Sequence, residues 1–195
     1  MFNQDFLLPD EVRQILFVKP ALEGPTGTLL AMSRMPLGDG WVPDLPIIPV
    51  VLGANGYTFN KVEGDKKTPL GCFCLGSAFG VADKAASIKF DYIKLGVDDK
   101  FIDDPEHPDY NRWICGETTA KSYETMLRND ERYDLGIIVE YNMHPIIVGL
   151  GSAIFIHIWE NSKTGTAGCI AMSSENLQQL LAYLKPQANP HIAIF

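Results

Sequence analysis

The sequence lacks the features that mark membrane proteins and nucleic-acid-binding proteins. None of its apolar runs approaches the roughly 20 residues that a membrane-spanning helix requires. It contains no cluster of Lys and Arg, and 24 acidic against 16 basic residues give a net charge of −8. Because binding to a phosphate backbone depends on concentrated positive charge, we expect neither a membrane span nor a nucleic-acid partner.

Signals for metal binding are also missing. The four cysteines, Cys72, Cys74, Cys115 and Cys169, form no Cys-x-x-Cys pair with a matching His spacing, so we predict free thiols and no zinc site. The acidic segment 97–111 lacks the D-x-D-x-D-G spacing of a calcium loop, which favours a solvated loop at the edge of a site. We therefore expect no metal and no cofactor.

Length and composition are those of one globular domain. The chain has 195 residues, of which 46% are hydrophobic and 21% charged. We expect residues 1–195 to form a single domain and to act as a monomer. Residues 1–17 show no basic region, apolar region or cleavage site of a secretory signal, so no signal peptide is visible. This pattern fits a cytosolic protein or a mature, trimmed chain.

Short apolar runs separated by Gly and Pro predict a mostly β fold. We expect strands at residues 14–18, 28–33, 47–52, 71–75, 135–140, 153–159 and 169–172.

Helical signals are few. One helix near the C-terminus is predicted by a Ser cap, by Lys185-Pro186 after its end, and by leucines at helical spacing: Leu177, Leu180, Leu181 and Leu184. The cap is Ser173 or Ser174. A second, weaker helix is expected at residues 119–127.

A cysteine and a histidine in neighbouring strands form the first candidate site. His157 lies in the middle of an apolar strand, and Cys169 begins the next one after a turn-rich segment. If the two strands pair as a hairpin, the imidazole can take the thiol proton, which predicts a lowered pKa for Cys169 and a nucleophilic thiolate. Gly168 leaves room for a carbonyl, and backbone N–H groups beside it can bind an oxyanion. The alternative is an inert buried cysteine and a core histidine.

The polar segment 61–71 is the second candidate. It has no G-x-x-x-x-G-K-[ST] phosphate loop. Taken by itself it predicts a turn leading into a strand, with Glu63 in exposed ion pairs to Lys61 or Lys67. We expect this segment to shape a site without taking part in the chemistry.

Two separated motifs resemble one known family. The first is K-x-E-G-D-x-K-T-P-x-G from Lys61 to Gly71, and the second joins G-S-A-I-F-I-H, ending at His157, to T-A-G-C-I-A-M, beginning at Thr166. Together they resemble the L,D-transpeptidase, or YkuD-like, catalytic domain, in a branch with T-A-G-C in place of S-H-G-C. The resemblance extends over roughly residues 28–195.

The resemblance implies a mostly β, sandwich-like fold and an acyl transfer on peptidoglycan stem peptides. Cys169 would attack the carbonyl of the third stem residue, expel the terminal D-alanine and form a thioester. An amine of another stem would then give a 3→3 cross-link, whereas water would give L,D-carboxypeptidase activity. His157 would act as base and acid, oriented by a backbone carbonyl for which Ile158 is the candidate. The expected location is the cell envelope or periplasm.

The resemblance also suggests the residues that surround the substrate. These are Thr166, Lys61, Glu63, Asp65, Thr68, Tyr110, Asn111 and Ser152. Two positions depart from the commoner pattern: Ala167 replaces a histidine, and Ala171 replaces an arginine. Recognition of a substrate carboxylate must then come from elsewhere, with Arg112 and Lys61 as candidates.

Two alternatives remain from the sequence. One is a non-catalytic, peptidoglycan-binding envelope scaffold, against which the presence of both Cys169 and His157 argues. The other is a cytosolic cysteine peptidase or amidase, which the lack of a visible signal peptide favours.

Overall fold

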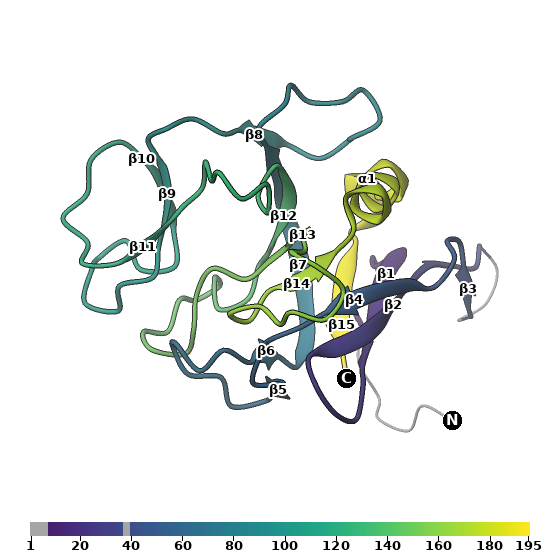
Figure 1. Ribbon diagram of the computed structural model, residues 1–195. Coiled ribbons are helices and arrows are strands. Elements are labelled where there is room, and N and C mark those ends of the chain that lie inside the picture. The colour runs from purple at the N-terminus through teal and green to yellow at the C-terminus, as the bar shows by residue number, and fades with distance from the viewer. Residues whose placement is uncertain (1–7, 37–39) are drawn as a thin grey trace.

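Alternating and continuous apolar runs build a molecule made mainly of strands (Figure 1). The computed structural model describes residues 8–36 and 40–195. Its strands are β1 (Gln14–Pro20), β2 (Thr26–Arg34), β3 (Trp41–Pro43), β4 (Ile48–Val51), β5 (Tyr57–Thr58), β6 (Thr68–Pro69), β7 (Gly71–Gly80), β8 (Tyr92–Lys94), β9 (Asp99–Ile102), β10 (Trp113–Cys115), β11 (Tyr123–Thr125), β12 (Leu135–Val139), β13 (Phe155–Ile158), β14 (Ile170–Met172) and β15 (His191–Ile194).

The main sheet closes on itself. Its pairings run β1-β15-β7-β12-β13-β14-β4-β2, and β2 pairs with β1 again. Strand β3 extends this path beyond β2, and β8 pairs with β7. The mostly β prediction is confirmed. The arrangement differs from two stacked layers because β1 bonds to both β2 and β15, which joins all these strands into one sheet.

Every strand expected from the sequence overlaps an observed one. The largest difference is in β7, which continues beyond the expected end at residue 75 to Gly80. Small residues in its second half allow close packing, since a Cβ on Gly80 would lie 2.5 Å from the Asp134 carbonyl oxygen.

The predicted C-terminal helix is confirmed as α1 (Ser174–Tyr183), the α-helix of the described residues. Ser173 is its N-cap, and the side-chain oxygen accepts a hydrogen bond from the Asn176 amide. Leu177, Leu180 and Leu181 are buried. A 3-10 turn, η1 (Pro186–Ala188), follows and leads into β15.

The helix predicted at residues 119–127 is wrong. Strand β11 lies there and pairs with β9, which also pairs with β10 (Trp113–Cys115). Tyr123 and Thr125 are exposed while Glu124 is half-buried, so the segment has the two-residue period of a strand. Tertiary pairing with β9 thus overrides the weak local preference for a helix.

The acidic segment 97–111 is also less solvated than expected. It contains β9, in which Phe101 and Ile102 are buried, followed by a turn in which Tyr110 is 2% exposed. In Figure 1 the small β9, β10 and β11 sheet stands to one side of the main sheet.

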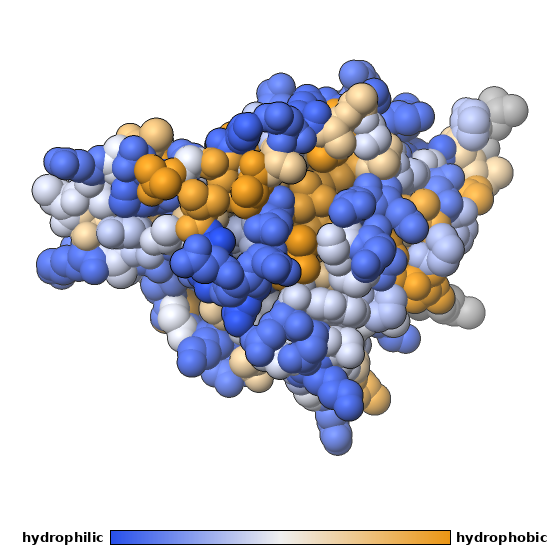
Figure 2. Space-filling model, turned by 45° about the horizontal axis from the view of Figure 1, so that its top comes forward, coloured by the Kyte–Doolittle hydropathy of each residue, from blue (hydrophilic) through white to orange (hydrophobic). Residues whose placement is uncertain are grey.

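Two hydrophobic clusters form the interior. The larger joins the main sheet to α1, and the smaller surrounds Phe79 and Phe155 and includes Cys169. Phe101 and Tyr133 meet Phe155 edge to face, with ring centroids 5.1 and 5.7 Å away. Hydrophilic residues cover most of the face in Figure 2, with hydrophobic residues gathered in its middle. Among the described residues, no helix is long and apolar enough to cross a membrane.

Candidate active site

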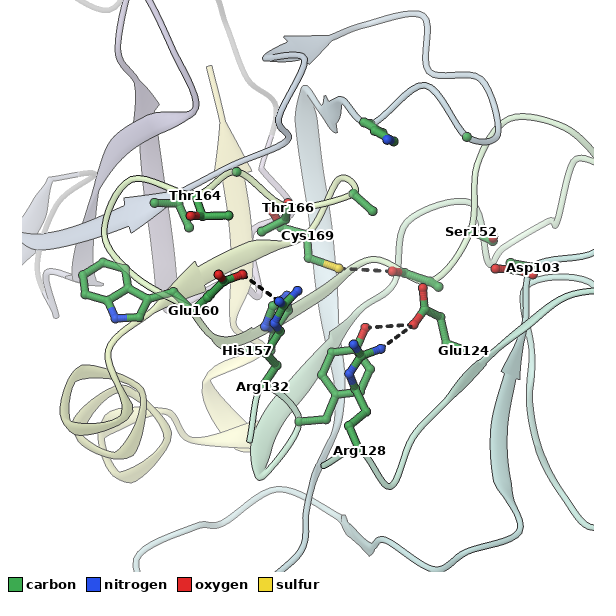
Figure 3. Close-up of a pocket in the computed structure, with 18 of the residues that line it drawn as sticks. Asp103, Glu124, Arg128, Arg132, Ser152, His157, Glu160, Thr164, Thr166 and Cys169 are labelled. Atoms are coloured by element: carbon green, nitrogen blue, oxygen red, sulfur yellow. Dashed lines mark hydrogen bonds and ion pairs between the residues drawn. The ribbon is translucent and has the colours of Figure 1, made fainter. Parts of the chain in front are cut away.

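A cavity of about 360 Å³ has both Cys169 and His157 in its wall (Figure 3). Its other walls come from segments far apart in the sequence, among them Lys61 with Glu63, Glu124 with Arg128 and Arg132, Ser152 with Ala153, and Thr164 to Ala167. The closed sheet thus brings together the two motifs, which are separated in the sequence by the 80 positions from Gly71 to Gly151.

The pairing of β13 and β14 positions the thiol and the imidazole. The predicted hairpin is wrong, because these strands are parallel, with His157 opposite Ala171. The connecting loop runs back along the strands, and Thr166 bridges Gly53 on the way. Because side chains alternate along a strand, Cys169, two residues before Ala171, lies on the same face as His157.

The thiol of Cys169 is buried and neutral. It donates a hydrogen bond to the Ala153 carbonyl oxygen at 3.3 Å, and the Phe155 amide donates to its sulfur at 3.4 Å. Burial raises the pKa of Cys169 to about 12. The predicted lowering of this pKa is therefore wrong, because loss of hydration outweighs the nearby positive charges of Lys61 and Arg128.

The imidazole of His157 is fixed in one tautomer. Its Nδ1 lies 2.7 Å from the Ile158 carbonyl oxygen. A carbonyl only accepts, so Nδ1 carries the hydrogen and Nε2 is the free basic nitrogen. This is the carbonyl contact expected from the sequence. Burial also lowers the pKa of His157 to about 4, which keeps the ring neutral at pH 7.

Acid is expected to destabilise the protein through His157. In the unfolded chain a histidine binds a proton near pH 6.5, whereas burial lowers the pKa of His157 in the fold to about 4. Its contribution to stability is complete above pH 6.5 and is lost as the pH falls toward 4. Between pH 7 and pH 4.5 the free energy of unfolding should fall by about 2 kcal/mol from this group.

Urea unfolding at both pH values tests this, with His157→Asn as the matched variant. The wild type should lose about 2 kcal/mol more than the variant over this interval. Equal losses in the two proteins would mean that His157 is not held neutral.

Glu63 lies inside the site and makes no surface ion pair. Its Oε2 accepts hydrogen bonds from the Tyr110 hydroxyl at 2.5 Å and the Ser152 hydroxyl at 2.7 Å. The expected pairing with Lys61 or Lys67 is wrong, since Lys61 pairs with Asp65 at 2.8 Å. Glu63 thus joins the motif of residues 61–71 to the start of the segment that contains His157.

The remaining predicted residues support the wall of the cavity. The Asn111 side chain donates to the Tyr141 and Asn142 carbonyls and accepts from the Ala153 amide. Thr68 is fully buried, and its hydroxyl accepts from the Gly53 amide. These residues, with Asp65 and Tyr110, lie behind the lining and hold it in place.

The turn before Cys169 is closed by Thr166. Its hydroxyl donates to the Cys169 carbonyl oxygen at 2.6 Å and accepts from the Gly168 amide at 3.1 Å. Gly168 is buried with φ +142, a backbone conformation that favours glycine. The structure therefore brings Cys169, His157, Lys61, Glu63, Ser152 and Thr166 together on one cavity, with Gly168 directly behind.

Several charged lining residues were missed from the sequence. Arg132 pairs with Glu160 at 2.7 Å on one side of Cys169, and Asp103 lies on the other side (Figure 3). Arg128 and Glu124 lie between them. Asp103 lies in the acidic segment 97–111 that was expected at the edge of a site. Glu124 lies in the segment predicted as a helix, and Arg128, Arg132 and Glu160 carried no signal beyond their charge. The carboxylate candidate Arg112 is exposed and lies outside this lining.

Within residues 8–36 and 40–195, no group of His, Cys, Asp and Glu side chains could hold a metal ion. One oxygen of Asp103, Oδ1, is buried without a hydrogen-bond partner in that part of the chain, and burial raises the pKa of this carboxyl. Burial likewise raises the pKa of Glu124. The acidic side of the cavity is thus poorly hydrated.

Comparisons with known proteins place this geometry in context. Two solved structures are similar in fold: Bd1075 from Bdellovibrio bacteriovorus and a lysine-to-alanine variant of the helical cell shape determining protein Pgp2 from Campylobacter jejuni. Each is 15% identical with a TM-score of 0.50, and they match 94% and 95% of this chain. The chain spans about half the length of those proteins, 48% and 47%. No curated protein matches the sequence.

The family comparison covers most of the chain. Residues 46–192 match the model of the YkuD family, described as the L,D-transpeptidase catalytic domain. This range includes Lys61, His157 and Cys169. The chain therefore belongs to the YkuD family of L,D-transpeptidase catalytic domains.

Proposed function

We propose that this protein is a peptidoglycan L,D-transpeptidase that works through a thioester on Cys169. The observation that carries the proposal is the placement of a thiol and an imidazole on one cavity, with the imidazole Nδ1 bound by the Ile158 carbonyl. A nucleophile, a base and an orienting acceptor suffice for acyl transfer without a metal. The donor is a stem tetrapeptide that ends in D-alanine.

Because the Cys169 thiol and the His157 imidazole are both neutral before substrate binds, the first step must include a proton transfer between them. His157 Nε2 takes the Cys169 proton as the sulfur attacks the carbonyl of the third stem residue, so charge forms only with the substrate in place. The resulting imidazolium gives this proton to the nitrogen of the departing D-alanine, which leaves a thioester. Rotation of the thiol away from the Ala153 carbonyl precedes the attack.

Deacylation reverses these roles. An amine of a second stem attacks the thioester, and His157 removes its proton and returns a proton to the sulfur. The product with an amine is a 3→3 cross-link, and the product with water is a tripeptide, which would be L,D-carboxypeptidase activity. We place the protein in the cell envelope or periplasm, where this substrate lies. That residues 1–195 act as one domain and as a monomer stays a prediction.

Product analysis by liquid chromatography and mass spectrometry tests the proposal. Incubation with a purified disaccharide-tetrapeptide should release D-alanine and yield a cross-linked dimer, together with tripeptide where water is the acceptor. Folded protein that binds the muropeptide without releasing D-alanine would instead support the scaffold. Folded protein that neither binds nor cleaves it would favour a cysteine peptidase or amidase with another substrate.

A further inference from the structure

Lys61 is a buried cation with unused hydrogen-bond donors. It is 4% exposed, and its Nζ donates to Asp65 Oδ1 at 2.8 Å. Asp65 is held in turn by the amides of Val62 and Lys67. Burial raises the pKa of Asp65, but these hydrogen bonds outweigh it and keep that pKa below its usual value. An ammonium has three N–H groups, and within the described residues the other two meet no protein acceptor.

Two glycines leave room for the Lys61 side chain next to the residue before Cys169. A Cβ on Gly151 would lie 2.7 Å from Lys61 Cε, so the stem of the lysine runs across a glycine that leaves space for it. A Cβ on Gly168 would lie 3.3 Å from Lys61 Nζ. The ammonium therefore reaches the residue immediately before Cys169, and both side chains line the same cavity.

A cation at this point stabilises the charge that develops during acyl transfer at Cys169. Attack on a carbonyl places a negative charge on its oxygen, and an unpaired charge is costly in a site as buried as this one. Lys61 Nζ lies next to Gly168, the residue before Cys169, and both Lys61 and Cys169 line the cavity in which the carbonyl is attacked. Its partner Asp65 lies behind the lining, so Asp65 does not compete for the free N–H groups from within the cavity.

We propose that Lys61 is a catalytic residue whose ammonium donates a hydrogen bond to the oxyanion of each tetrahedral intermediate on Cys169. This inference rests on the proposed acyl transfer. Lys61 only donates a hydrogen bond in this role, so the step moves no proton or electron to or from Lys61. It differs from binding of a substrate carboxylate by Lys61, which would act on affinity and leave the rate at saturation unchanged.

Two reactions of the same thiol separate these roles in the variant Lys61→Met. Acylation by the disaccharide-tetrapeptide passes through an oxyanion, whereas alkylation by iodoacetamide does not. At saturating donor, the acylation rate should fall about 100- to 1000-fold. The alkylation rate of Cys169 should change by less than about tenfold, which corresponds to one unit of thiol pKa.

Each other outcome overturns the inference. Equal losses in both reactions would mean that Lys61 acts on the thiol or on the fold. An unchanged saturating rate with weaker donor binding would make it a carboxylate-binding residue. Should Lys61→Met not fold, Lys61→Met/Asp65→Asn removes the pair without leaving a lone buried charge and carries the same test.

The control is Lys163→Met, which removes an exposed positive charge outside the cavity lining and should change neither reaction. The wild type distinguishes this inference from the proposed function. A wild type that forms no thioester refutes both. A wild type that forms one at the same rate as Lys61→Met refutes the role of Lys61 alone.

Discussion

Replacing Cys169 by alanine is expected to abolish D-alanine release from the disaccharide-tetrapeptide while the protein stays folded. The sulfur is the atom that forms the thioester, so its loss removes the covalent route altogether. Removing one buried sulfur from the cluster around Phe155 should cost about 1 kcal/mol of stability. Product analysis and thermal unfolding of the same sample check both parts.

The chain contains a matched control for this experiment. The Cys74 sulfur lies 3.2 Å from His191 Nε2, and His191 Nδ1 lies 2.9 Å from the Asn189 carbonyl oxygen. This second thiol–imidazole pair is outside the lining of the cavity. Cys74→Ala should therefore retain full activity. Loss of activity in Cys74→Ala with activity kept in Cys169→Ala would contradict the assignment of the nucleophile.

The second large effect is expected from Gly168→Ala. The added Cβ would lie 3.0 Å from the Lys67 carbonyl oxygen and 3.3 Å from Lys61 Nζ, at a φ of +142 that L side chains rarely adopt. The turn must shift to admit it, and a displacement of about 1 Å at a reacting group costs about 100-fold in rate. We expect at least that loss in acylation, with a stability loss of about 1–3 kcal/mol.

Gly116→Ala separates strain from crowding. Gly116 has φ +111, but a Cβ there would meet nothing within 4 Å. This variant should lose stability through strain and keep the acylation rate of the wild type. Single-turnover acylation followed by intact mass measures both variants. Wild-type acylation in Gly168→Ala would show that the position of this turn does not matter.

Much of the β framework could be predicted from local pattern. The apolar runs at β1, β4, β12 and β13 are bounded by turn residues, and the leucines of α1 repeat at helical spacing with Ser173 before them. These signals depend only on residues that are neighbours in sequence. They can therefore be recognised without knowledge of the fold.

The direction in which β13 and β14 pair could not be predicted from local pattern. A turn-rich connection between His157 and Cys169 fits a hairpin as well as the observed parallel pair, because both bring the side chains together. The loop that makes the parallel arrangement possible is bridged at Thr166 to Gly53, a residue more than 100 positions earlier. Contacts at that separation leave no local pattern.

The pKa of Cys169 and the partners of Glu63 could not be predicted from the sequence either. The proximity of His157 suggested a lowered pKa for Cys169, but the actual direction depends on burial, which raises it. Two lysines lie near Glu63 in the sequence and suggested ion pairs. Its side chain instead accepts hydrogen bonds from Tyr110 and Ser152, which belong to distant segments. Burial and long-range partners both follow from closure of the sheet.

The most direct test of the central claim is the intact mass of the protein after mixing with the disaccharide-tetrapeptide. Covalent acyl transfer predicts an adduct equal to the donor less D-alanine, present in the wild type and absent from Cys169→Ala. It should disappear when an amine acceptor is added. Release of D-alanine without any adduct, or an adduct of the same mass in Cys169→Ala, would contradict a thioester on Cys169.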